Sequence, residues 1–128
     1  MAEPIVSPSP ITNADPDYRF SATGKSFAIR EWRGSGPAKL HVHQADDEAW
    51  HVIEGLLHFR FVDRELAVEA GQSVFVPAGV AHTYEAISAR YLVVLTPRLL
   101  ALIEELQHTS GEINHAAIYQ KYQSQLLE

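Results

Sequence analysis

The chain has 128 residues, no cysteine and a formal net charge of −6 at pH 7. This length suits a single domain that can bury its own core, and the lack of cysteine excludes disulfides and thiol chemistry. The acidic balance argues against nucleic acid or an anionic membrane as a partner, and no apolar run is long enough to span a bilayer. We expect a cytoplasmic protein, because the N-terminal stretch also lacks the basic and apolar regions of a secretory signal.

Residues 1–23 form a tract rich in proline, with prolines at Pro4, Pro8, Pro10 and Pro16. Proline has no backbone N–H to donate to a neighbouring strand, and the tract shows no alternation of apolar and polar residues. The sequence therefore predicts an extended N-terminal arm over residues 1–23, lying along the edge of a sheet.

Residues 24–97 consist of short runs typical of β-strands, separated by turn residues. In the clearest run, Leu57 and Phe59 alternate with His58 and Arg60, which gives one apolar and one polar face. Gly55 is interpreted as a turn between two strands. The predicted strands cover residues 27–32, 39–43, 49–53, 57–62, 66–69, 73–76, 83–86 and 91–95. This pattern is typical of an all-β sandwich or barrel.

Residues 98–128 are predicted to be helical. Thr96 is a good N-cap and Pro97 suits the first helical position. Apolar residues then recur at helical spacing, namely Leu99, Leu102, Ile103 and Leu106. After the break at Gly111, Asn114 is expected to cap a second helix, with one apolar stripe of Ile118, Tyr122 and Leu126.

Three histidines and one glutamate form the candidate functional site. His41 and His43 are two residues apart on a predicted strand, so their side chains share a face, with Val42 opposite. Glu48 opens the next extended run, and His82 follows a proline–glycine turn. Such a set suits one divalent transition metal, either Fe, Mn, Ni, Co or Zn. The simpler interpretation is that these histidines lie separately on exposed strand faces.

Glycine and proline residues at fixed intervals surround these side chains. They form two motifs, which consist of Gly36, His41, His43, Glu48 and Gly55, and of Gly71, Pro77, Gly79 and His82. Over about residues 24–97 the chain resembles the cupin superfamily, in its small single-domain (monocupin), quercetinase-like or cupin 2 form. The resemblance implies a double-stranded β-helix, or jelly-roll barrel, with a C-terminal helical extension. It also implies that the metal ligands are His41, His43, Glu48 and His82.

Two positions depart from the family pattern. Gly36 lies one residue closer to His41 than is usual, which is a difference in loop length. Ala86 stands where the family usually has an asparagine four residues after the histidine of the second motif. That asparagine is not a metal ligand in the family, so the implied ligand set is intact, while some hydrogen bonding around it is changed.

The alternation of side chains along strands predicts which neighbours face the metal. Counting by twos from Glu48 places Trp50 on the same face, and counting from His82 places Tyr84 there. His51 is an odd number of residues from Glu48, so it should point away from the metal.

Aromatic residues are the predicted walls of a substrate cavity. Trp50, Phe59 and Tyr84 would surround a planar or apolar small molecule, although large aromatics are also ordinary core residues. The hydroxyl of Tyr84 is a candidate hydrogen-bond donor to a metal-bound ligand. Glu48 and Tyr84 are therefore the candidate catalytic residues.

Three functions fit this site. The resemblance favours a dioxygenase-like oxidoreductase that acts on a small aromatic or enol-bearing molecule. The alternatives are a non-redox isomerase, lyase or cyclase that uses the metal as a Lewis acid, and a binding or sensor protein without catalysis. We also expect a homodimer, formed through one sheet or an exchanged N-terminal arm, because the apolar residues Val42, Ile53 and Val74 are predicted on outer strand faces.

Overall fold

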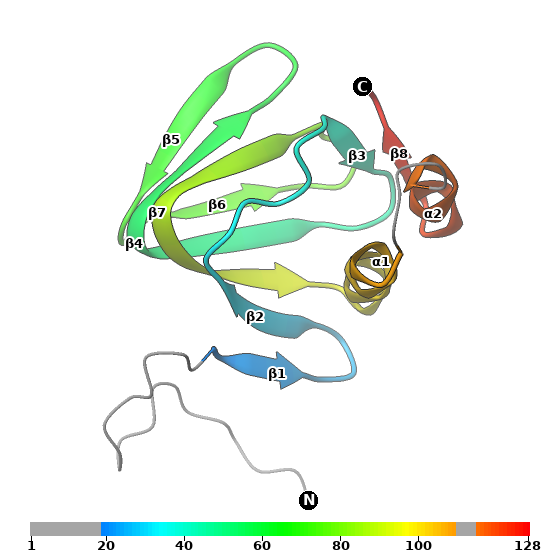
Figure 1. Ribbon diagram of the computed structural model, residues 1–128, viewed down its shortest axis with the longest axis horizontal. Coiled ribbons are helices and arrows are strands. Elements are labelled where there is room, and N and C mark those ends of the chain that lie inside the picture. Colours follow the sequence, from blue (N-terminus) through cyan, green and yellow to red (C-terminus); the bar gives the residue numbers. More distant parts are fainter. Residues whose placement is uncertain (1–18, 110–114) are drawn as a thin grey trace, which may run out of the picture.

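The computed structural model describes residues 19–109 and 115–128, which form a strongly curved β-structure with two helices at one end (Figure 1). The strands are β1 (Ser21–Thr23), β2 (Ala28–Trp32), β3 (His41–His43), β4 (Glu48–Arg60), β5 (Glu65–Glu69), β6 (Ser73–Val76), β7 (Thr83–Leu95) and β8 (Ser124–Leu126). The helices are α1 (Pro97–Gln107) and α2 (His115–Lys121). Neither helix found in these ranges is long and apolar enough to cross a membrane.

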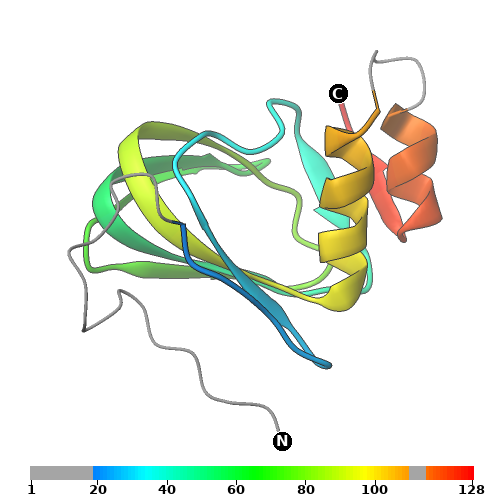
Figure 2. The ribbon, with the colours of Figure 1, turned by 60° about the horizontal axis from the view of Figure 1, so that its bottom comes forward.

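All strand pairs are antiparallel, and the long strand β4 pairs with β5, β6 and β7. The main sheet has the order β1-β2-β7-β4-β5, with β6 also paired to β4, and β3 pairs with β8 in a second, two-stranded sheet. The first half of β4 pairs with β6 and the second half with β5, while β7 runs along most of its other side. The sheet therefore curls around its own inner face, and α1 and α2 stand side by side at one end of the curl (Figure 2).

Gly55 does not end a strand, contrary to the prediction. The two strands expected on either side of it form the single 13-residue strand β4, and the register with β7 shifts on both sides of Glu54. Gly55 has a φ of 73°, and a Cβ there would lie 2.1 Å from the carbonyl oxygen of Ser88. Glycine is needed because the backbone bulges and approaches β7 closely. The runs predicted at 83–86 and 91–95 likewise merge into β7.

The core lies inside the curl and extends beneath α1. The alternation predicted along the second half of β4 is confirmed, because Leu57 and Phe59 are fully buried while His58 and Arg60 are partly exposed. Val74 was expected on an outer face, but it is paired with the buried Trp50 and packs against the core. The largest buried apolar side chains are Trp50, Tyr91, Phe59, Leu57, Leu95, Leu99 and Leu102. Each contributes roughly 1.5–3 kcal/mol through burial.

Helix α1 begins as the sequence predicts. The Oγ1 of Thr96 accepts a hydrogen bond from the backbone N–H of Leu99 at 3.2 Å, and Pro97 occupies the first turn. Leu99 and Leu102 are buried against the barrel. The N-cap and the apolar spacing therefore place this helix over the open end of the curled sheet.

The last residues of the chain form a strand, although the sequence predicted helix as far as residue 128. Helix α2 ends at Lys121, so Tyr122 and Leu126 do not continue its apolar stripe. After Gln123, which has a φ of 54°, the chain enters β8 and pairs with β3. This pairing satisfies backbone groups of β3, a long-range gain that local helical spacing does not report. Asn114 and Gly111 lie outside the described residues.

The expected N-terminal arm is described only in its last part. Within residues 1–23, Ser21–Thr23 forms the edge strand β1, which pairs with β2. This agrees with an extended segment along a sheet edge. The prolines of the arm fall within residues 1–18, which lie outside the described residues.

Candidate metal centre

Three buried histidines converge inside the barrel. His41 and His43 lie on β3, and His41 forms an antiparallel bridge with His82, with N···O distances of 3.2 and 2.8 Å. Residues directly opposite in such a bridge point to the same side, as do residues two apart on one strand. The candidate ligand nitrogens of the three rings all lie within 4.8 Å of one another. The predicted convergence of the three imidazoles is thus what the backbone pairing produces.

Backbone carbonyls orient two of the three rings. The Nδ1 of His41 lies 2.9 Å from the carbonyl oxygen of Lys39, and the Nδ1 of His82 lies 3.0 Å from that of Val80. A carbonyl oxygen can only accept, so each Nδ1 carries the proton and donates it. In a neutral imidazole this leaves a lone pair on Nε2, which is the form that binds a metal.

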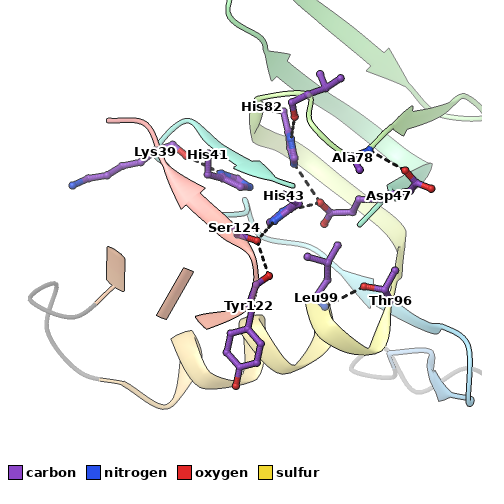
Figure 3. Close-up of polar contacts among 12 residues, drawn as sticks. Lys39, His41, His43, Asp47, Ala78, His82, Thr96, Leu99, Tyr122 and Ser124 are labelled. Atoms are coloured by element: carbon purple, nitrogen blue, oxygen red, sulfur yellow. Dashed lines mark hydrogen bonds and ion pairs between the residues drawn. The ribbon is translucent and has the colours of Figure 1, made fainter. Parts of the chain in front are cut away.

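The third ring is held by the C-terminal strand. The Nδ1 of His43 lies 2.8 Å from the Oγ of Ser124, which is also within 3.3 Å of the carbonyl oxygen of Tyr122 (Figure 3). Ser124 was not predicted as a site residue, because it lies 81 residues beyond His43 and no local motif marks it.

Glu48, the fourth ligand that the resemblance implies, lies beside two of the three imidazoles. Its Oε1 lies 3.3 Å from the Nε2 of both His43 and His82. Burial alone would raise the pKa of Glu48, but the two adjacent imidazoles lower it to about 2, so the carboxylate is ionised. Burial and the neighbouring rings of His82 and His43 lower the pKa of His41 to about 4. The cluster therefore combines a negative carboxylate with a His41 ring that resists protonation.

The hydrogen-bond donors of the cluster face outward and its acceptors face inward. His82 donates its Nδ1 proton to the Val80 carbonyl. The Nε2 of His82 therefore faces the ionised Glu48 either with an additional proton or with a lone pair. Two buried acceptors that face each other are unfavourable unless a cation lies between them. A divalent metal ion would meet this need, since three imidazole nitrogens and a carboxylate suit borderline ions. The residues His41, His43, Glu48 and His82 fit the predicted metal.

The cluster forms part of the wall of a cavity of about 480 Å³. Most of the other lining side chains are apolar or aromatic, namely Trp32, Trp50, Tyr84, Leu102, Ile103, Leu106 and Tyr119. Charged residues of the lining are Arg19, Glu31 and Arg33, and the loop from Gly34 to Pro37 forms another part. One side of the cavity is therefore supplied by α1 and α2, and the other by the barrel.

Two of the three predicted substrate-contacting aromatics line this cavity. Trp50 and Tyr84 do so, whereas Phe59 is fully buried behind them, with ring centroids 4.9 and 5.1 Å from theirs. Phe59 is thus a core residue that supports the wall. His51 is exposed and bonds Ser73 on the outer face, as the strand alternation predicts.

The indole nitrogen of Trp50 is buried and has no hydrogen-bond partner among the described residues. A buried donor without a partner is unfavourable. Although Trp50 lines the cavity, this nitrogen is itself buried and does not open onto it.

The hydroxyl proton of Tyr84 is used in a hydrogen bond to Tyr91. Tyr84 Oη lies 2.8 Å from the Oη of Tyr91, which itself donates to the carbonyl oxygen of Gly34. Each hydroxyl has one proton, so Tyr84 donates to Tyr91 and keeps only acceptor capacity. Burial raises the pKa of Tyr84 well above its ordinary value. Donation from Tyr84 to a metal-bound ligand would therefore require this chain to rearrange.

These features define a small, mainly β barrel with a buried cluster that fits a metal ion. Residues 30–96 match the cupin domain (Cupin_2), which is more than half of the 128-residue chain. The chain belongs to this cupin family, and its fold is the predicted jelly-roll barrel followed by two short helices. Residues 97–128 lie beyond the matched domain.

Solved structures of other cupins agree with this fold. A cupin-2 domain containing protein from Shewanella frigidimarina NCIMB 400 is 22% identical, with a TM-score of 0.52, over 66% of this chain and 84% of that one. A cupin protein from Bacteroides fragilis is 14% identical, with a TM-score of 0.51, over 67% of this chain and 82% of that one. None of the curated proteins matches the chain. At these identities the likeness concerns the fold alone.

Proposed function

We propose that the protein is a metal-dependent enzyme, a dioxygenase-like oxidoreductase that acts on a small aromatic or enol-bearing molecule. The observation that carries this proposal is the position of the cluster, which lines a cavity of about 480 Å³ with mainly apolar walls. Four protein ligands leave open positions on a six-coordinate ion, as a reactive site requires. When bound, such an ion would supply Lewis-acid or redox chemistry at a substrate oxygen.

The cavity walls support an aromatic or otherwise planar substrate. Leu102, Leu106 and Tyr119 line one side, and Trp32 and Trp50 line the barrel side. Apolar walls with a few convergent polar groups are typical of sites for small organic molecules. These residues would orient the substrate and exclude water.

Oxygen uptake separates this proposal from its alternatives. The protein is purified without oxygen, its metal content is measured, and it is reloaded with Fe(II) before a panel of flavonols and catechols is added. We expect substrate-dependent oxygen consumption, which His41→Ala should abolish and His51→Ala should preserve. Turnover of an enolisable compound without oxygen would instead indicate an isomerase, lyase or cyclase. Tight binding without any turnover would indicate a sensor, and failure to retain any divalent metal would overturn the metal centre itself.

We further propose that the protein acts as a homodimer. A row of apolar residues crosses the outer face of the main sheet in register, from Ile29 through Val94 and Ala49 to Phe75. Phe75 is 62% exposed and Val94 is 36% exposed. Contiguous apolar residues of this kind are typical of a surface that is buried in an assembly.

A further inference from the structure

We propose that the C-terminal strand is a working part of the metal centre, with Ser124 as a positioning residue for His43. Residues 122–128, here called the C-terminal clasp, would set the tautomer and orientation of that ligand. Metal binding and docking of the clasp would therefore strengthen each other. This inference rests on the metal-binding part of the proposed function and does not depend on which reaction, if any, the protein catalyses.

The partner of His43 differs in kind from those of the other two rings. His41 and His82 each donate to the carbonyl of the residue two positions earlier in the chain. These two partners are therefore set by the local backbone. His43 depends on Ser124, whose side chain reaches the ring only when β8 is paired with β3. Ser124 is 2% exposed, so water does not readily replace it. One metal ligand is thus oriented by a segment from the far end of the chain.

The serine hydroxyl alone would leave the tautomer of His43 open, because a hydroxyl both donates and accepts. The carbonyl oxygen of Tyr122 resolves this choice, since it lies 3.3 Å from the Ser124 Oγ and can only accept. The single hydroxyl proton of Ser124 therefore goes to Tyr122, and its oxygen accepts from the Nδ1–H of His43. The Nε2 of His43 is left as a lone pair that faces Glu48 and the shared centre.

The rest of the clasp holds Ser124 in place through the backbone. His43 and Ser124 are directly paired across the two strands. On one side of this pair Gln44 donates its N–H to the carbonyl of Gln123 at 2.9 Å, and on the other side Leu127 donates to Leu40 at 2.9 Å. Ser124 therefore lies between two interstrand hydrogen bonds that fix the position of β8 beside β3, the strand that carries His41 and His43.

Glu128 fastens the outer end of the clasp. Its carboxylate accepts hydrogen bonds from both terminal nitrogens of Arg60, at 2.7 and 3.0 Å, and from the backbone N–H of Leu40 at 2.8 Å. Arg60 lies at the end of β4, so the last residue of the chain is joined to the main sheet. A two-pronged arginine–carboxylate pair has a defined geometry, which a single contact would not provide.

Coupling between the clasp and the metal must be reciprocal. If the docked clasp raises the affinity of the cluster for a metal, then the bound metal must stabilise the docked clasp by the same factor. Residues that orient a ligating histidine typically change metal affinity about 10–100-fold when removed. The clasp lies wholly outside residues 30–96, so this coupling belongs to the extension of this chain.

The first test measures the affinity for Zn(II) and Co(II) by competition with a chromophoric chelator. We expect Ser124→Ala to bind either ion about 10–100-fold more weakly, and Ser124→Thr, which keeps the hydroxyl, to recover part of this loss. Gln125→Ala is the matched control, because Gln125 is exposed on the same strand and its side chain points away from His43. A serine with only a structural role would change the unfolding temperature of the metal-free protein without changing the affinity of the folded protein.

The second test measures the reciprocal effect by hydrogen exchange. Zn(II) should slow exchange of the Gln44 and Leu127 amides in the wild-type protein, and it should do so less in Ser124→Ala. Arg60→Gln, which loosens the clasp from outside the cluster, should also weaken Zn(II) binding. Unchanged affinity in Ser124→Ala, or unchanged exchange of these amides with Zn(II), would overturn the coupling alone. If the wild-type protein binds neither ion, the metal centre and the coupling fall together.

Discussion

The hydrogen-bond partners of each imidazole decide what the cluster can hold. Outward Nδ1–H donors on His41 and His82 leave inward lone pairs, and the ionised Glu48 adds a negative charge beside His43 and His82. The pKa of His41 is lowered to about 4 by burial and by the neighbouring imidazoles, so near neutral pH this ring is uncharged. The arrangement thus favours a metal ion over extra protons as the positive charge of the site.

Removing one imidazole should therefore remove most of the bound metal. We expect His41→Ala or His82→Ala to lose metal and to lose the stabilisation that metal gives, about 2.7 kcal/mol when the metal is at 100 times its Kd. His51→Ala is the control, since His51 is exposed and bonds Ser73 on the outer face. Metal analysis and thermal unfolding with and without metal check both expectations. Full occupancy in both variants would show that the ligands are assigned wrongly.

Gly36 lies close to the ring of Tyr84 in the loop from Gly34 to Pro37, which lines the cavity. A Cβ on Gly36 would lie 2.6 Å from the Cε1 of Tyr84, whose hydroxyl is tied to Tyr91. The loop has little freedom to retreat, because Ser35 accepts a hydrogen bond from the N–H of Ala86.

Gly36→Ala should consequently destabilise the protein by roughly 1–3 kcal/mol, the usual effect of overpacking. Gly34→Ala is a matched control in the same loop, because no atom lies within 4 Å of its expected Cβ. Urea unfolding of the two variants gives the comparison. Equal stability of both would mean that the ring of Tyr84 moves freely.

Residue spacing in the sequence predicted the strands and helices whose structure depends on residues close together in the chain. The strand alternation from Glu48 correctly placed Trp50 inside and His51 outside, and the N-cap at Thr96 correctly opened α1. The errors came where distant segments meet. Gly55 was read as a turn although it allows close approach of β7, and the final strand was read as helix because its partner β3 lies some 80 residues earlier.

The clasp formed by that strand should make the protein sensitive to acid. Hydrogen bonds from Arg60, and then from the Leu40 amide, lower the pKa of Glu128 from 4.5 to about 2. A carboxyl group whose pKa is lower in the folded state stabilises the fold above pH 4.5, and this effect is lost as the pH falls toward 2.

Glu128→Gln should thus be less stable than the wild type at pH 6, and the difference should shrink steadily between about pH 4.5 and pH 2. Arg60→Gln should give the same convergence, because it removes the other half of the pair. Urea midpoints measured across this range provide the test. A difference that stays constant down to pH 2 would mean that the ion pair does not cause the stabilisation.

In the whole molecule, the candidate site is built partly from the matched domain and partly from the extension that follows it, residues 97–128. Residues 30–96 carry the four candidate ligands on β3, β4 and the bridge at His82. The extension supplies the cavity wall from Leu102, Leu106 and Tyr119, together with the clasp. The family motifs mark the candidate ligands, while several residues that shape the cavity lie outside those motifs. For the proposed function, substrate choice would therefore depend on the lining residues of α1 and α2.

The outer face of the main sheet is the surface through which we expect two copies of the protein to form a homodimer. Phe75 stands at the end of the apolar row, and its exposed ring would be buried against the same face of a second copy. Phe75→Glu should place a charge in that contact and shift the protein toward monomer, with metal content unchanged. Val62→Glu is the matched control, because Val62 is 77% exposed in the turn after β4 and lies outside the row. Light scattering over a range of concentrations measures the mass of each variant. A wild-type protein that is a monomer throughout that range would refute the dimer and leave the metal centre untouched.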